Sequence, residues 1–435
     1  MKDLIIIGAG PGGYEVALEA KKQGLDVALI NGGKLGGTCL NYGCIPTKTY
    51  HKNASLMKDL KDAEIYGLKD LAYSFDFTKV KSRKDKVVET LKDGIGFLMN
   101  KLEIEVINGF AKFKDDNTIL VNDKEYQAKN FIIATGSKDR QLAKFADALS
   151  SDDMLHMETL PKKIVIIGGG VIGIEYAAIF NQFGVDIEIV EYMDRIVSTI
   201  DPELSKRLFS YLKRQKIKFH LSSKALYKDD EFVYIEEKGK EVKIAYDKVL
   251  VSIGRVANYQ DLNLDNCHVK YDKNGIITDD NFLTSNSNIY AVGDVTGKMM
   301  LAHYAKYSGL RALNHILGKE DNIRFDLVPN CIFSFPEIAT VGVSEEYYKE
   351  NELPYEIFKS VYQSNGKAFS ANETDGFVKL VVHENVITGA AIIGYDASTL
   401  IHEMVIVINK KMTVGEFKDV IHAHPTLSEL FNESF

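Results

Sequence analysis

Two cysteines, Cys39 and Cys44, are the residues of this chain best suited to chemistry. Four residues separate them, and Gly43 permits the tight turn that would bring two sulfur atoms within bonding distance. Pro46 suits the first turn of a helix, where its missing N–H is not needed. A helix starting near Cys44 would lower the pKa of that thiol, and Lys48 would add positive charge on the same helical face. The spacing therefore predicts a redox-active pair.

Two other interpretations of the pair remain open, a metal site and two inert buried thiols. A zinc ion needs three or four ligands, but neither a second closely spaced cysteine pair nor a nearby histidine is present. Inert thiols would leave the neighbouring glycines unexplained. We therefore favour the redox interpretation and expect no metal.

Two glycine-rich turns predict two nucleotide-binding βαβ units. Each turn follows an apolar run, at residues 4–7 and 164–167, and precedes a helical stretch. In such turns the first glycine makes the bend, the second lets a pyrophosphate approach, and the third lets helix and strand pack closely. The glycines are Gly8, Gly10 and Gly13 in the first turn and Gly168, Gly170 and Gly173 in the second.

The residue that ends the second strand of each unit distinguishes the two sites. In the second unit this is Glu191, whose carboxylate would accept bonds from ribose hydroxyls and repel a 2′-phosphate. NAD is therefore expected there rather than NADP, with a solvated loop glutamate as the alternative. In the first unit the position is Asn31, whose amide oxygen can accept a ribose hydroxyl bond without the assistance of charge.

At about 150 residues per domain, a chain of 435 residues is expected to form about three domains. The predicted fold class is α/β, with two Rossmann-like nucleotide-binding domains and a C-terminal α+β domain. A helical region is expected at residues 49–102 and strands at residues 103–133. The predicted domains are residues 1–145 with 265–325, residues 146–264, and residues 326–435.

Charge and composition exclude several classes of protein. A net charge of −8 argues against nucleic acid or an anionic membrane as the main partner. Four cysteines are too few for a secreted disulfide scaffold, so a cytoplasmic location is expected. The first apolar run ends in glycines and is no signal peptide. The apolar tract at residues 164–180 holds three consecutive glycines and Glu175, which predicts a buried strand, turn and helix rather than a membrane span.

The segment at residues 36–48, GGTCLNYGCIPTK, resembles the signature of the flavoprotein disulfide reductases. Its TCLN and CIPTK variants are typical of dihydrolipoamide dehydrogenases, and the likeness extends over nearly the whole chain. Similar segments are ATG at residues 134–136, GRVAN at 254–258 (with Ala257 in place of the common proline), IYAVGD at 289–294 and MLAH at 300–303.

The resemblance implies FAD at the first unit and NAD at the second. Asp294 would bond a hydroxyl of the flavin side chain, the alternative being that it caps a turn. The FAD-binding residues implied are Gly8, Gly10, Gly13, Asn31, Thr38, Lys48, Thr135, Gly136, Gly293, Asp294, Leu301, Ala302 and His303. Those implied for NAD are Gly168, Gly170, Gly173, Glu191, Gly254 and Arg255.

The C-terminal segment offers an acid–base pair. A thiol attacks a disulfide only as a thiolate, and a histidine oriented by a carboxylate is a suitable base near neutral pH. By resemblance, His424 is that base and Glu429 its partner, whereas His422 is a bystander. Thr426 and Glu429 also match a capping box, which would place Glu429 for helix stability alone.

The resemblance further implies the reaction, which is oxidation of protein-bound dihydrolipoamide through a Cys39–Cys44 disulfide and FAD, with a hydride passed to NAD⁺. Cys39 would exchange with substrate, and Lys48 would pair with Glu175 beneath the flavin. A homodimer is implied, with His424 serving the partner's disulfide, and so are lipoyl domains of 2-oxo acid dehydrogenase or glycine cleavage complexes. The alternatives are another flavoprotein disulfide reductase, such as a glutathione-type enzyme, and a redox-sensing or structural flavoprotein.

Overall fold

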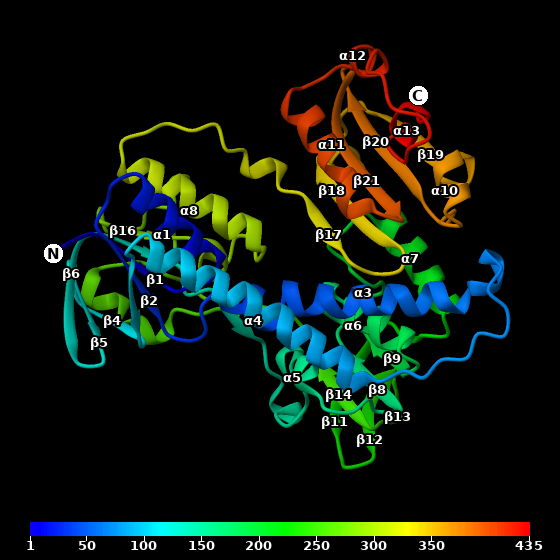
Figure 1. Cartoon of the computed structure of the whole chain (residues 1–435), viewed down its shortest axis with the longest axis horizontal. Coiled ribbons are helices and arrows are strands. Elements are labelled where there is room, and N and C mark those ends of the chain that lie inside the picture. Colours follow the sequence, from blue (N-terminus) through cyan, green and yellow to red (C-terminus); the bar gives the residue numbers. More distant parts are fainter.

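The computed structural model describes residues 1–435 as three domains, each built on its own sheet (Figure 1). The first domain lies at the left of that view, the second at the bottom and the C-terminal domain at the upper right. Two long helices, α3 (Cys44–Lys61) and α4 (Phe77–Lys101), extend from the first domain, and α3 runs between the other two. The predicted fold class is confirmed.

The first domain contains a parallel sheet extended by an antiparallel meander. Its first strand has a continuous apolar sequence because it is buried on both faces, with α1 (Pro11–Lys22) and α8 (Ala302–Ile316) among the covering helices. The strands are β1 (Lys2–Ile7), β2 (Val27–Asn31), β3 (Glu105–Asn108), β4 (Ala111–Asp115), β5 (Thr118–Val121), β6 (Lys124–Ile133) and β16 (Ile289–Ala291), in the order β3-β2-β1-β6-β5-β4 with β16 paired to β6.

The predicted helical region at residues 49–102 contains two helices with a connection at residues 62–76. The short 3₁₀ helix at Ala63–Tyr66 ends at Gly67, whose φ of 82° lies in the left-handed region. Asp76 then starts α4 by accepting a bond from the N–H of Lys79 at 3.2 Å.

The second domain repeats the strand, turn and helix pattern. A parallel sheet in the order β10-β9-β8-β14 is flanked by an antiparallel β11-β12-β13 sheet. The tract at residues 164–180 is the buried strand, turn and helix that its glycines predict. None of the chain's helices is both long and apolar enough to span a bilayer. The elements are β8 (Lys163–Ile167), α6 (Val171–Gln182), β9 (Asp186–Val190), α7 (Pro202–Arg214), β10 (Lys218–His220), β11 (Ser223–Lys228), β12 (Phe232–Glu237), β13 (Lys240–Ala245) and β14 (Lys248–Val251).

A short antiparallel ribbon, β7 (Ser137–Asp139) with β15 (Arg255–Ala257), joins the first two domains. Beyond it, Leu262 and Leu264 pack with the core of the first sheet. They lie just before residue 265, where the second segment of the first domain is predicted to start.

The C-terminal domain is an antiparallel sheet in the order β17-β18-β21-β20-β19, packed against α11 (Ala397–Asn409). Its remaining elements are β17 (Asn330–Ile332), β18 (Glu337–Gly342), α9 (Glu345–Glu350), β19 (Glu356–Val361), α10 (Gly366–Ser370), β20 (Phe377–His383), β21 (Val386–Gly394), α12 (Val414–Lys418) and α13 (Glu429–Asn432).

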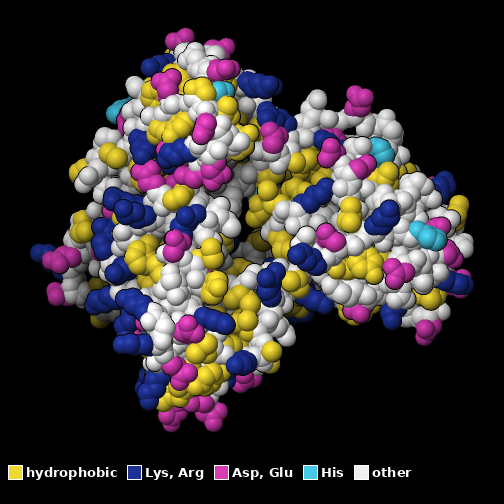
Figure 2. Space-filling model, turned by 180° about the vertical axis from the view of Figure 1, so that it is seen from behind, with side chains coloured by type: hydrophobic (Ala, Val, Ile, Leu, Met, Phe, Trp, Pro, Cys, Tyr) yellow, Lys and Arg dark blue, Asp and Glu magenta, His cyan; other side chains and the backbone are white.

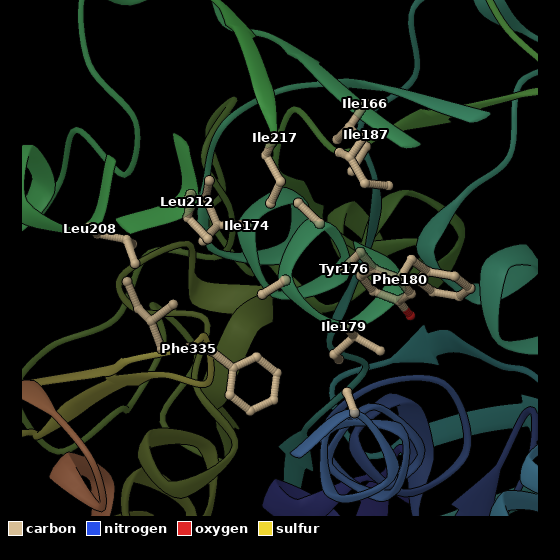
Figure 3. Close-up of a cluster of buried hydrophobic side chains, with 14 of the residues drawn as sticks. Ile166, Ile174, Tyr176, Ile179, Phe180, Ile187, Leu208, Leu212, Ile217 and Phe335 are labelled. Atoms are coloured by element: carbon tan, nitrogen blue, oxygen red, sulfur yellow. The ribbon is translucent and has the colours of Figure 1, made fainter. Parts of the chain in front are cut away.

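One hydrophobic core around α6 joins all three domains. It includes Tyr50 of α3, most of α6, and Phe335 of the C-terminal domain. Figure 3 shows the side chains of α6 gathered with those of α7 and with Phe335. This shared packing fixes α3 against α6, which are the two helices that carry the predicted Lys48 and Glu175.

Lys379 is a buried lysine at the contact between the second and C-terminal domains. Its side chain is 1% exposed, and its Nζ lies 2.9 Å from Glu345 and 3.3 Å from Glu203. It also pairs with Asp201, the residue that caps α7. Carboxylates of both domains therefore surround one ammonium group, and removing that group would leave the buried Asp201 without its cation.

We predict that Lys379→Met lowers the apparent free energy of unfolding by about 3–5 kcal/mol, because the buried carboxylate of Asp201 loses its counter-charge. The measurement is urea unfolding followed by circular dichroism. The matched control is Lys349→Met, which removes a 55%-exposed partner of the same Glu345 and should cost about 1 kcal/mol or less. Equal effects of the two substitutions would contradict the prediction.

Candidate active site

A cavity of about 690 Å³ lies between the first two domains and reaches β17 of the C-terminal domain. From behind, the surface is hollowed where the three domains meet (Figure 2). The cavity wall brings together most of the residues that the sequence singles out for FAD and for redox chemistry. They are Gly8, Gly10, Asn31, Thr38, Cys39, Cys44, Lys48, Thr135, Gly136, Glu175, Arg255, Gly293, Asp294, Leu301 and Ala302.

The first glycine turn is shaped to receive a pyrophosphate. Gly8 has a φ of 116°, and a Cβ on Gly13 would lie 1.8 Å from the Gly8 oxygen, so neither position accepts a side chain. Gly10 has only the Cα of Gly37 near its Cβ position, at 3.9 Å, and it lines the cavity. The N-terminal ends of α1 and of α2 (Gly37–Tyr42) thus meet at the cavity wall, where their backbone amides suit an anionic group.

Asn31 ends β2 in the cavity wall, where its Nδ2 donates to Asn108 Oδ1 at 3.0 Å. Its Oδ1 therefore remains to accept a hydrogen bond from a ribose hydroxyl. Phe110, which the sequence analysis did not single out, lines the same end of the cavity beside Gly32.

The second glycine turn has the same geometry outside this cavity. A Cβ on Gly173 would lie 2.1 Å from the Gly168 oxygen, whereas Gly170 has open space around its Cβ position. Glu191 follows β9 and accepts bonds from the N–H groups of Gly169 at 2.5 Å and Met193 at 2.7 Å. Its carboxylate is therefore held beside the turn and is not a freely solvated side chain, so the turn and its acid fit NAD.

The structure confirms that a helix begins at Cys44. Cys39 lies on α2 and Cys44 is the first residue of α3, with Gly43 between the helices. A Cβ on Gly43 would lie 3.2 Å from the oxygen of Thr38, tighter than an ordinary contact, so glycine suits this turn. The two thiols share a hydrogen bond.

Because of this bond, the two thiols differ in acidity. The hydrogen bond from Cys39 and the positive charge of Lys48 lower the pKa of Cys44 to about 7, despite its burial. The pKa of Cys39 is raised, because its proton is held by Cys44 and its side chain is buried. In the reduced pair Cys44 is therefore the thiolate near neutral pH, and Cys39 keeps the proton.

Lys48 and Glu175 form an ion pair between α3 and α6. Lys48 Nζ lies 2.9 and 3.1 Å from the two oxygens of Glu175, whose side chain is 8% exposed. The C-terminal domain supports the pair, because the N–H of Phe333 donates to Glu175 at 3.0 Å and its ring lies 4.2 Å from Lys48 Nζ. Cys331 also reaches the cavity, and burial raises its pKa to about 11, so it stays protonated. The sequence carried no signal for Phe333 beyond its apolar strand pattern.

Asp294 and Arg255 both line the cavity, whereas the glycines of the second turn do not. Asp294 accepts a bond from the Ser137 hydroxyl at 2.6 Å, and burial raises its pKa. Arg255, which the resemblance assigns to NAD, lines this cavity and contacts Ser137 and Asp139. Its neighbour Gly254 lies outside that wall.

His303 lies outside the cavity wall, although the resemblance assigns it to FAD. Its Nε2 is 2.9 Å from the carbonyl oxygen of Pro329. Leu301 and Ala302, the two preceding residues, do line the cavity.

His424 and Glu429 form a pair at the surface of the C-terminal domain. His424 Nδ1 lies 2.9 Å from Glu429 Oε1, and the His424 side chain is 79% exposed. Glu429 Oε2 accepts a bond from the Thr426 N–H at 2.8 Å, and this bond together with His424 lowers the pKa of Glu429. The expected capping box is incomplete, because the Thr426 hydroxyl accepts no bond from the Glu429 N–H and donates to the Ala423 carbonyl.

Glu429 thus orients His424 with one oxygen and supports the chain turn with the other. His422 is buried and lies 2.6 Å from Glu403, which suits a structural role. The His424 pair does not line the cavity that holds the two cysteines of the same chain.

The chain is similar to proteins of known families over its whole length. Residues 2–309 match the family model of pyridine nucleotide-disulphide oxidoreductases, and residues 328–435 match the dimerisation domain of that family. A protein of Bacillus subtilis is 38% identical, covering 99% of this chain and 97% of the relative. A protein of Chlamydia trachomatis is 36% identical, covering 99% and 96%. Both relatives are named dihydrolipoyl dehydrogenase.

Solved structures agree with this relationship. The HOCl-induced flavoprotein disulfide reductase RclA of Escherichia coli is 25% identical, with a TM-score of 0.89 and 99% of both chains covered. LpdA of Mycobacterium tuberculosis is 24% identical, with a TM-score of 0.91 over 99% of this chain and 98% of the other, and shares the fold.

We predict that Lys48→Met raises the pKa of Cys44 from about 7 toward its usual value, because a nearby positive charge is lost. The thiolate of the reduced protein should then appear only at higher pH, which a titration of thiolate ultraviolet absorbance measures. Lys52→Met, one helical turn further along α3, is the matched control and should leave the titration unchanged. A Lys48→Met titration that coincides with the control would refute the role of Lys48.

Proposed function

Since the chain belongs to the pyridine nucleotide-disulphide oxidoreductases, we propose that it is a dihydrolipoyl dehydrogenase, which oxidises dihydrolipoamide to lipoamide with FAD and NAD⁺. The observation that carries the proposal is the pair of Cys39 on α2 and Cys44 at the start of α3, in the wall of a cavity whose glycine turn fits a dinucleotide. Glu191 at the second turn favours NAD over NADP, which separates this activity from that of a glutathione-type reductase.

The two cysteines have different tasks in this reaction. In the oxidised enzyme a substrate thiolate attacks Sγ of Cys39, forming a mixed disulfide and releasing Cys44 as the thiolate. The second substrate thiolate then attacks the substrate sulfur of the mixed disulfide, which closes the lipoamide ring and frees Cys39. Cys44 suits the leaving position because its pKa is the lower of the two, at about 7. Bound FAD and NAD⁺ supply the acceptor for the electron pair, which leaves the enzyme as a hydride.

The base for the substrate thiols is His424, oriented by Glu429. The pair faces solvent and lies apart from its own chain's cavity, so it is available to a second subunit. We infer a homodimer in which each His424 serves the partner's disulfide, with residues 328–435 as the dimerisation domain. Lipoyl domains of 2-oxo acid dehydrogenase or glycine cleavage complexes are the proposed donors of dihydrolipoamide. A cytoplasmic location stays a prediction from the sparse cysteines.

We predict that the purified protein reduces NAD⁺ with dihydrolipoamide and that Cys39→Ser or Cys44→Ser abolishes this activity, because a serine cannot form the disulfide. NADH absorbance measures the rate. Cys267→Ala, in the core of the first sheet, is the control and should retain the activity. Absence of NADH formation by wild-type protein that turns over NADPH and glutathione disulfide would overturn the proposal.

We also predict that His424→Gln lowers the rate by about 10²–10⁴-fold, as expected for loss of a general base. Mixing and re-associating His424→Gln subunits with Cys39→Ser subunits should restore activity, because one active site of the hybrid dimer then holds both intact groups. A hybrid as inactive as its parents would exclude catalysis across the interface. Glu403→Gln, beside the buried His422, provides a comparison outside the proposed pair.

A further inference from the structure

Arg255 is held rigidly at the junction of the first two domains. In the ribbon that joins them, Arg255 stands opposite Asp139, and Ala257 stands opposite Ser137. The Arg255 side chain is only 16% exposed. Its backbone is therefore part of the ribbon that connects the two domains, while its side chain lies in the wall of the cavity.

All the hydrogen bonds of the Arg255 guanidinium go to the β7 strand. Nε donates to the hydroxyl of Ser137 at 2.8 Å, and Nη2 donates to the carbonyl of Ser137 at 2.8 Å. Nη1 pairs with Asp139. A guanidinium bound through all three nitrogens is fixed in orientation, and none of its partners belongs to the second glycine turn.

Ser137 connects Arg255 to Asp294 through its hydroxyl. Because its hydroxyl accepts the bond from Arg255, its single proton is directed at Asp294 Oδ2, at a distance of 2.6 Å. Asp294 lines the cavity, and its Oδ1 is left for a group inside it. Burial raises the pKa of Asp294, whereas the Ser137 bond and the Arg255 charge act in the opposite direction and favour the carboxylate.

We propose that Arg255 and Ser137 are positioning residues for FAD, acting through Asp294, whose free oxygen they hold ready to accept a hydroxyl of the flavin side chain. This rests on the proposed function only in requiring that the cavity binds FAD. It also changes the role that the sequence suggests for Arg255, because the arginine serves the first nucleotide site and not NAD.

The test measures the Kd of FAD for apoprotein by flavin fluorescence. Ser137→Ala should weaken binding about 10-fold, as expected for loss of one hydrogen bond to a charged group. Arg255→Met should weaken it by a similar factor, and the double variant should be little worse than either single one, because the two residues act in series. Ser137→Thr, which keeps the hydroxyl, should restore the affinity. Lys138→Met, an exposed neighbour on β7, is the control and should bind FAD normally.

Two further measurements distinguish the proposed relay from independent effects and from a role in NAD binding. Combining Ser137→Ala with Asp294→Asn should add little to the loss caused by Asp294→Asn alone; fully additive losses would overturn the relay. The Kd of NADH should be unchanged in Arg255→Met, and a loss confined to NADH would return Arg255 to the second site. FAD affinities that follow this pattern in a protein without dihydrolipoamide activity would support the relay while refuting the proposed function.

Discussion

The ion pair between Lys48 and Glu175 is the interaction on which the arrangement of the active site depends. It joins α3, which begins with the reactive thiol, to α6, which begins at the second glycine turn. Glu175 is nearly inaccessible to solvent and also accepts the Phe333 N–H from the C-terminal domain. Since a buried carboxylate without a counter-charge is strongly unfavourable, this contact holds the two nucleotide units in one relative position.

The chemistry of the reduced thiol pair depends on which of the two sulfurs holds the proton. Cys39 and Cys44 have the same side chain, but only Cys44 stands at the start of a long helix close to Lys48. The difference in acidity is therefore a property of the backbone and of neighbouring charge. In the proposed reaction, this difference suits one sulfur to exchange with the substrate and the other to leave.

Local signals in the sequence predicted what depends on short stretches of chain. The glycine turns, the helix start at Cys44 and the strand-ending Glu191 could be predicted because each is a requirement of backbone geometry over a few residues. Arg255 shows the limit of prediction from local sequence, because its partners on β7 lie more than a hundred positions away in the chain. Phe333 likewise depends on how the third domain docks, and Thr426 bonds Ala423 because α13 starts later than its motif suggests.

The buried ammonium of Lys379 limits how the enzyme can move. Swinging the second domain away from the C-terminal domain would separate Asp201 from a cation that has no access to water, at a cost of several kcal/mol. Hinge bending of that kind is therefore disfavoured by this contact. The contact thus favours nucleotide exchange within a stiff frame, by shifts of side chains and loops at the rim of the binding crevice.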